Sequence, residues 1–249
     1  AALEFRISYF KGRDVLDLTP GHTIKNPGEG MSDRGFILTN GRLMDCLSCH
    51  STPTLPIPLE KSSPSTLIPN VSCERCHGPG REHIALARLG VEDPDVLRMP
   101  FGHGRWTAPE QLRLCGSCHR LPGMVPLSTV TPENLSLARF PSVGISQSAC
   151  YLKSQGAFSC TTCHDPHARA SSDAAGYDPT CISCHSRAED RPDGLLLPVV
   201  ASLCSVQPRS DCVSCHMPKR DVGHGLAFSD HWLRRIVEGP SSLNQAKSE

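Results

Sequence analysis

The chain has 249 residues, of which 25 are Lys or Arg and 25 are Asp or Glu, and only 5% are aromatic. The formal net charge of zero argues against a nucleic-acid-binding protein, because such proteins carry an excess of Lys and Arg. No apolar stretch approaches the roughly 20 residues of a membrane-spanning helix, and the first residues lack the basic start and apolar run of a signal peptide.

The predicted elements are short, and they are separated by 22 Pro and 20 Gly residues. Residues 5–10 and 35–41 predict the strands of a small N-terminal β-hairpin or ribbon. Residues 51–70 and 120–148 predict proline-rich loops, and residues 239–249 predict a polar tail. Helices are predicted over residues 80–89, 108–118 and 229–237, the second with Thr107 as its cap and Pro109 in its first turn.

Cysteine and histidine form a repeated motif. Twelve of the 14 cysteines fall into six Cys-x-x-Cys pairs, each followed directly by His, which is far too regular for chance. A brief helical turn under each motif would place its cysteines and histidine on one side. The motifs, numbered 1 to 6 in chain order, are Cys46, Cys49 and His50; Cys73, Cys76 and His77; Cys115, Cys118 and His119; Cys160, Cys163 and His164; Cys181, Cys184 and His185; and Cys212, Cys215 and His216.

Three kinds of site use this cysteine spacing. A zinc ribbon pairs two such motifs around one ion, and a thioredoxin-like site uses one pair for redox exchange, but neither requires His at the next position. Covalent c-type haem does require it, because the two thiols add to the two vinyl groups of one porphyrin and the adjacent imidazole reaches the iron. The sequence therefore predicts six covalently bound haem c groups, each with the motif histidine as the proximal ligand of its iron.

Six haems would also supply the core that the composition lacks, because each porphyrin face is a large and rigid apolar surface. The intervals between motif histidines are too irregular for a repeat array. We therefore expect one hexahaem cytochrome c domain over residues 1–238 and a polar tail over 239–249. The expected fold class is mainly α with extensive irregular loops and a small N-terminal β-hairpin, and the chain is not expected to fold without haem.

Six histidines lie outside the motifs, one for each predicted iron. They are His22, His83, His103, His167, His224 and His231. Full bis-histidine ligation would keep the potentials low, whereas methionine would raise them. The competing ligands are Met31, Met44, Met99, Met124 and Met217, of which Met99 lies near His103. The other interpretation of any one of the six is an ordinary surface or core histidine.

Chain length limits how these histidines can pair. His83 and His167 follow a motif histidine by six and three residues. That path is too short for the chain to round a porphyrin, so each is expected to serve a different haem. Such crossed ligation would force the haems close together.

The two remaining cysteines, Cys150 and Cys204, predict a disulfide. Thioether attachment of haem takes place on the exported side of a membrane, where disulfides are permitted. The other interpretation is a pair of free buried thiols. The predicted location is periplasmic or extracellular.

Several segments resemble a known family. They are LTPGH at 18–22, VSCERCHGPGREH at 71–83, LCGSCH at 114–119, SCTTCHDPH at 159–167, DCVSCHMPKR at 211–220 and FSDH at 228–231. Together they resemble the multihaem c-type cytochromes related to the tetrahaem cytochrome of the ammonia-oxidation pathway, including bacterial relatives that carry tetratricopeptide repeats. The resemblance covers most of the chain, although relatives often have a further haem motif upstream and repeat helices downstream.

The resemblance implies a mainly helical and irregular fold with closely stacked haem pairs, and electron transfer as the activity. By matching motif positions it implies a set of distal ligands, with His103 matching less clearly. That set is His22, His83, His167, His224 and His231.

Three functions fit these patterns. The first is electron transfer between redox protein partners with no catalytic residue, because saturated irons cannot bind substrate. The second is an enzyme acting on small nitrogen compounds, which would need one five-coordinate iron, with His103 as the missing ligand and the third haem its candidate partner. The third is a subunit of an extracellular cytochrome filament or of a membrane complex. The zero net charge gives no steering field and mildly favours a homo-oligomer or fixed subunit over a diffusing carrier.

Overall fold

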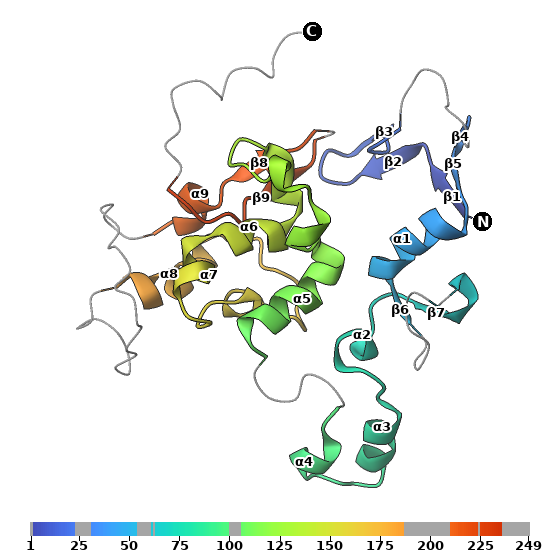
Figure 1. Ribbon diagram of the computed structural model, residues 1–249. Coiled ribbons are helices and arrows are strands. Elements are labelled where there is room, and N and C mark those ends of the chain that lie inside the picture. The colour runs from blue at the N-terminus through green and yellow to red at the C-terminus, as the bar shows by residue number, and fades with distance from the viewer. Residues whose placement is uncertain are drawn as a thin grey trace. The chain divides into compact units, whose positions relative to one another are not determined.

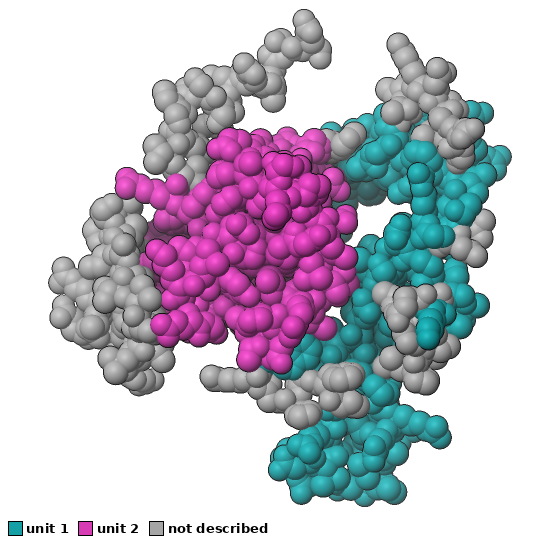
Figure 2. All heavy atoms as spheres, viewed as in Figure 1, with its two compact units in different colours: residues 1–106 teal, residues 107–249 magenta. Residues whose placement is uncertain are grey.

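The computed structural model of the protein describes residues 2–22, 31–53, 61, 63–99, 106–186, 210–223 and 225–235. It divides into two compact units, residues 1–106 and 107–249 (Figure 2), and each unit is described by itself. The predicted fold class is confirmed, because short helices and loops predominate and a small β-hairpin lies near the N-terminus (Figure 1). The single domain over 1–238 stays a prediction, and the tail at 239–249 lies outside the described residues.

The N-terminal unit begins with two small antiparallel sheets. Strands β1 (Ala2–Phe5), β5 (Gly35–Leu38) and β4 (Met31–Ser32) form one in that order, and β2 (Ile7–Phe10) forms a hairpin with β3 (Val15–Leu18). The strands predicted at 5–10 and 35–41 both contain strand residues, but β2 pairs with residues 15–18, and β5 pairs with β1 instead. Gly35 has φ +148°, and a Cβ there would lie 1.9 Å from the Glu4 carbonyl oxygen. The close approach of β5 to β1 at this point therefore requires glycine.

The rest of this unit carries motifs 1 and 2. Its elements are α1 (Asn40–His50), β6 (Ser51–Pro53), η2 (Pro64–Thr66), β7 (Leu67–Pro69), α2 (Cys73–His77), α3 (Arg81–Arg88) and α4 (Pro94–Leu97). Strands β6 and β7 pair antiparallel inside the segment predicted as a loop at 51–70. Helix α3 confirms the helix predicted at 80–89. The strand predicted over 35–41 ends at Leu38, because Thr39 takes the N-cap position of α1.

The C-terminal unit carries motifs 3 to 6. Its helices are α5 (Ala108–His119), α6 (Pro141–Gln147), α7 (Ala149–Lys153), α8 (Asp178–His185) and α9 (Cys212–His216), and its strands β8 (Lys219–Asp221) and β9 (Ala227–Ser229) pair antiparallel. Short 3-10 helices connect them: η3 (Pro122–Met124), η4 (Leu127–Thr129), η5 (Leu135–Arg139), η6 (Cys160–Thr162) and η7 (Ala175–Tyr177). Helix α5 starts as predicted, with a capping box between Thr107 and Glu110.

The prediction of a loop over 120–148 was wrong, because this segment contains η3 to η5 and helix α6. Pro141 stands in the first turn of α6, where its missing N–H removes no helical hydrogen bond. Val143 on α6 is fully buried, and Ile145 is nearly so. Helix α6 packs against α5 and therefore forms part of the apolar core of this unit.

The prediction of a helix over 229–237 was also wrong within the described residues. Ser229 ends β9, and residues 230–235 are not helical. The Asp230 carboxylate accepts a hydrogen bond from the backbone N–H of Trp232, at 3.0 Å. Such side-chain-to-backbone bonds compete with helix formation, so the segment is held as a turn instead.

Among the residues that the structure describes, no helix is long and apolar enough to cross a membrane.

Candidate haem sites

The six motifs lie on short helical turns, as predicted. Motifs 1, 3 and 5 end the helices α1, α5 and α8, motifs 2 and 6 make up α2 and α9, and motif 4 begins on η6. In each of the five α-helices the motif histidine is the last helical residue. Residues three and four apart share a helix face, so both thiols and the imidazole of such a motif can reach one ligand.

The motif cysteines lie at the surfaces of their units rather than inside them. Three of the twelve are exposed, namely Cys46, Cys73 and Cys215. The other nine are half-buried, namely Cys49, Cys76, Cys115, Cys118, Cys160, Cys163, Cys181, Cys184 and Cys212. No motif cysteine is fully buried, so a porphyrin can approach all six attachment points from outside the polypeptide. The thioether bonds themselves stay a prediction at all twelve positions.

Motifs 1 and 2 are joined in the N-terminal unit. The Arg75 guanidinium, inside motif 2, donates a hydrogen bond from Nη2 to the carbonyl oxygen of Ser48, inside motif 1, at 2.8 Å. The backbone N–H of Asn70 donates to the His50 carbonyl oxygen at 3.1 Å. The fully buried Thr52 hydroxyl donates to the Asn70 carbonyl and accepts from the Ser72 N–H. These contacts hold the end of one attachment helix beside the start of the next.

Motifs 3 and 4 are joined in the C-terminal unit. The buried Gln111 side chain on α5 accepts a hydrogen bond from the backbone N–H of Thr161, at 3.0 Å. The first cysteines of these motifs, Cys115 and Cys160, share a side-chain hydrogen bond, which lowers the pKa of the Cys115 thiol to about 7 and raises that of Cys160. The two attachment points therefore touch.

Motifs 5 and 6 repeat this arrangement with a carboxylate. The Asp178 side chain at the start of α8 accepts hydrogen bonds from the backbone N–H groups of Asp211, at 2.7 Å, and Cys212, at 2.9 Å. These two bonds lower the pKa of Asp178. The first cysteines Cys181 and Cys212 are again hydrogen-bonded to each other.

Motifs 4 and 5 are also neighbours. Burial raises the pKa of the Cys163 thiol to about 11, and the nearby charges of Cys181, Cys150 and Cys184 add to this effect. Electrostatic effects between thiols require proximity. Effects between thiols thus link motifs 3 and 4, motifs 4 and 5, and motifs 5 and 6 of the C-terminal unit.

The ring of His164, in motif 4, lies close to the ring of His231, which is outside the motifs. The rings of His164 and His231 have centroids 6.2 Å apart, with an interplanar angle of 33°. Since a metal–imidazole bond is about 2 Å long, two opposed imidazoles on one iron have centroids about 6 Å apart. Burial lowers the pKa of both histidines. Burial therefore favours the neutral imidazole, which is the form that ligates metals.

Backbone carbonyl groups fix the ring orientation of His83, His216 and His231. The Nδ1 atoms of His83, His216 and His231 lie within hydrogen-bonding distance of the carbonyl oxygens of Leu97, Arg234 and Ser229. A carbonyl oxygen can only accept, so each Nδ1 carries a proton, and in the neutral imidazole Nε2 then has the lone pair that a metal needs. The same hydrogen bond is common behind metal-bound histidines.

Two other predicted distal ligands have different surroundings. The His22 side chain is fully buried against the Phe36 ring, and Nε2 lies 3.5 Å from a carboxylate oxygen of Glu4. Neither ring nitrogen makes a hydrogen bond to a residue that the structure describes. His167 is exposed in the turn after motif 4, with Nδ1 3.5 Å from Asp165. His103 and His224 lie outside the described residues.

The predicted disulfide cannot be placed, since Cys204 lies outside the described residues. Its proposed partner Cys150 is half-buried on α7, where burial and the charges of Cys181 and Cys184 raise the pKa of its thiol. The Cys150–Cys204 bond stays a prediction.

The chain is similar to known cytochromes. The model of the family "cytochrome c554 and c-prime" matches residues 28–78, which contain motifs 1 and 2. The C-type polyheme cytochrome OmcB of Geobacter sulfurreducens, from strain DL-1/KN400 and from strain ATCC 51573, is 26% identical over 185 residues. These matches support a multihaem c-type cytochrome. The OmcB match covers 57% of this chain but only 25% of each relative, and no solved structure gives a significant match.

The residues of this chain fit covalent haem: paired thiols stand beside each motif histidine, and the His164–His231 spacing suits one iron. When bound, haem supplies reversible one-electron chemistry at iron. The chain's own residues would attach it through the motif cysteines and orient the imidazoles through hydrogen bonds such as those at His83, His216 and His231.

Sequence reasoning missed the polar residues that connect the motifs of this chain. Arg75, Gln111, Asp178 and Asp230 each make their contacts with backbone groups or charged side chains of other segments. No spacing rule marks them, because their partners are distant in sequence or are ordinary peptide groups. The FSDH segment at 228–231, in which Asp230 directly precedes His231, was the one local indication of these residues.

Proposed function

We propose that this chain is a hexahaem c-type cytochrome that carries electrons along closely spaced haems between redox protein partners. In this proposal each motif binds one haem, the irons are predominantly bis-histidine, and their potentials are low. The observation that carries it is the His164–His231 pair, whose 6.2 Å centroid separation suits two axial ligands of one iron.

The proposed electron path in the C-terminal unit follows the order of the attachment sites. Motif 3 touches motif 4 through Cys115 and Cys160, and motif 5 touches motif 6 through Cys181 and Cys212. Cys163 and Cys181 connect the two pairs. Haems attached at these points would be close neighbours, so an electron could pass through all four in chain order.

The proposed location is periplasmic or extracellular, because thioether attachment belongs to exported proteins. The proposed partners are redox proteins, with a homo-oligomer, a filament or a membrane complex as the larger assembly. A relationship to the cytochromes of the ammonia-oxidation pathway remains a prediction from the residues around the motifs.

Three measurements test this function. A pyridine haemochrome assay with an intact mass should give six haems per chain, and electron paramagnetic resonance should show low-spin irons. In His231→Ala one iron should become high-spin, and added imidazole should restore its low-spin signal. Fewer than six haems would contradict the count. An unchanged spectrum in His231→Ala would contradict the proposed ligand pair, and a high-spin iron in the native protein would favour a substrate site.

A further inference from the structure

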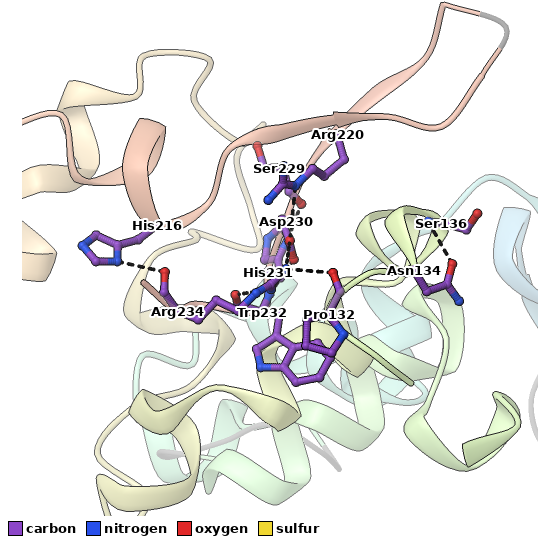
Figure 3. A network of polar contacts seen from close by, with 10 residues as sticks. All are labelled: Pro132, Asn134, Ser136, His216, Arg220, Ser229, Asp230, His231, Trp232 and Arg234. Carbon is purple, nitrogen blue, oxygen red and sulfur yellow. Dashed lines mark hydrogen bonds and ion pairs between the residues drawn. The ribbon is translucent and has the colours of Figure 1, made fainter. Parts of the chain in front are cut away.

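One short segment contacts histidines of two different haem sites. Within residues 229–234, the Ser229 carbonyl accepts a hydrogen bond from His231 Nδ1 at 3.0 Å, and the Arg234 carbonyl accepts one from His216 Nδ1 at 3.1 Å (Figure 3). His216 belongs to motif 6, and His231 faces His164 of motif 4. The orientation of both imidazoles thus depends on where this backbone segment is held.

Asp230 is the centre of the contacts that hold the segment. Its side chain is only 10% exposed, and its Oδ2 lies 3.0 Å from Arg234 Nη2 and 3.6 Å from Arg220 Nε. Its Oδ1 accepts the Trp232 N–H, and its own backbone N–H donates to the Pro218 carbonyl. The Asp230 carboxylate therefore connects strand β8, through Arg220, to Trp232 and Arg234 of the 229–234 segment.

Arg234 extends the same cluster. Its Nη1 donates to the Trp232 carbonyl at 2.9 Å, its Nη2 donates to the Pro132 carbonyl at 3.2 Å, and its guanidinium lies over the Trp232 ring at 5.1 Å (Figure 3). Pro132 is distant in sequence, so this arginine fixes the turn to the body of the unit.

Helix α6 packs directly on the segment. A Cβ added at Gly144 would lie 2.8 Å from the Trp232 backbone nitrogen and 2.9 Å from the His231 carbonyl carbon. The backbone of the turn therefore has no room to move toward α6. A small displacement of the turn would therefore change the orientation of the His231 and His216 rings.

We propose that Asp230 is a positioning residue that orients His231 and His216 together. Its negative charge, opposed by the positive charges of Arg220 and Arg234, sets the reduction potentials of both irons. This proposal rests on the proposed function, because it takes His231 and His216 as haem ligands. It goes beyond that function in naming a shared support for two sites that belong to different motifs.

The sign of the electrostatic effect follows from the charges. The cluster holds one carboxylate and two guanidinium groups, and the side chains of Arg220 and Arg234 are 17% and 21% exposed, so solvent screens them weakly. Removal of the carboxylate charge leaves the local field more positive. A more positive field disfavours the oxidised iron and raises its potential, whereas removal of one arginine lowers it.

The test compares four variants of the holoprotein by redox titration monitored with electron paramagnetic resonance. Asp230→Asn keeps an oxygen for the Trp232 N–H but loses the charge, so the irons should stay low-spin while two potentials rise. Arg234→Gln should lower the same two potentials. Asp230→Ala should release His231 and produce a high-spin iron. Asp221→Asn, which removes an exposed carboxylate on β8, is the matched control and should match the native protein.

The signal of the motif 4 haem is identified as the low-spin signal that disappears in His231→Ala. The proposal requires that this signal and a second one shift together, upward in Asp230→Asn and downward in Arg234→Gln. It is overturned if these variants behave like Asp221→Asn, or if both shift the potentials in the same direction. If Asp230→Ala does not accumulate, the Asn and Gln variants decide. A native protein in which His231→Ala changes no signal would instead overturn the ligand assignment of the proposed function.

Discussion

The two units support their haem motifs by different means. In the C-terminal unit, Val143, Leu137, Ala138, Ile145 and Ala108 are buried apolar residues on α5, η5 and α6, and motif 3 ends α5 itself. In the part of the N-terminal unit that the structure describes, the apolar side chains of comparable burial are Leu38 and Pro53. Beside motif 1 the three residues of β6 are buried, and two of them, Ser51 and Thr52, are polar.

This difference indicates how the two units use haem. A unit with its own apolar core has part of its stability before any porphyrin binds, whereas a unit tied by hydrogen bonds and short strands does not. We therefore expect the N-terminal unit to depend on its haems for nearly all of its core, and the C-terminal unit to depend on them less.

The largest expected effect comes from withholding haem. The chain produced without haem attachment should show no cooperative melting, because porphyrin contacts supply most of its apolar burial. Hydrogen exchange followed by mass spectrometry should find the residual protection in α5 and α6, with residues 2–99 exchanging rapidly. A compact apo-protein with equal protection in both units would contradict the expected difference between the units.

A smaller effect is expected from trimming the core of the C-terminal unit. Val143 is fully buried, so Val143→Ala should lower the free energy of unfolding of the holoprotein by about 2 kcal/mol. Val71, which is 56% exposed next to motif 2, is the matched control. Val71→Ala should change stability by less than about 0.5 kcal/mol. Chemical denaturation measures both, and an equal loss at Val71 would mean that a porphyrin packs on it.

The smallest effect is expected from acid at the contact between motifs 5 and 6. Hydrogen bonds from Asp211 and Cys212 hold the pKa of Asp178 below its ordinary value of 3.8. Its stabilising contribution is therefore complete above that value and is lost as the pH falls through the lowered pKa. Between about pH 6 and about pH 2, the native protein should lose more stability than Asp178→Asn. Asp221→Asn is the control, and an acid response of Asp178→Asn equal to the native one would refute this assignment.

The sequence predicted what depends on neighbouring residues. The capping box of Thr107 and Glu110 marked the start of α5 correctly, and the Cys-x-x-Cys-His motifs marked six helical turns. It failed where a distant contact decides the conformation. The segment after Ser229 has a helical pattern, but Asp230 bonds to Trp232 and to Arg220 across the strands.

The candidate sites show the same limit. The motif residues and the outlying histidines could be identified one by one, yet nothing in the sequence pairs His231 with His164. Helix α6 was missed because proline, serine and glycine suggested a loop, although Pro141 occupies the one helical position that suits it. Gln111 and Asp178 could not be predicted, because their acceptor role depends on how separate helices pack.

The hydrogen bonds behind His83, His216 and His231 end on peptide carbonyls rather than on side chains. Every amino acid has that group, so residues 97, 229 and 234 can be exchanged without removing the acceptor. A family can therefore change most of its sequence and still inherit the direction in which each imidazole points. Divergence is restricted by the path of the backbone, and similarity between such proteins is better sought in that path than in residue identity.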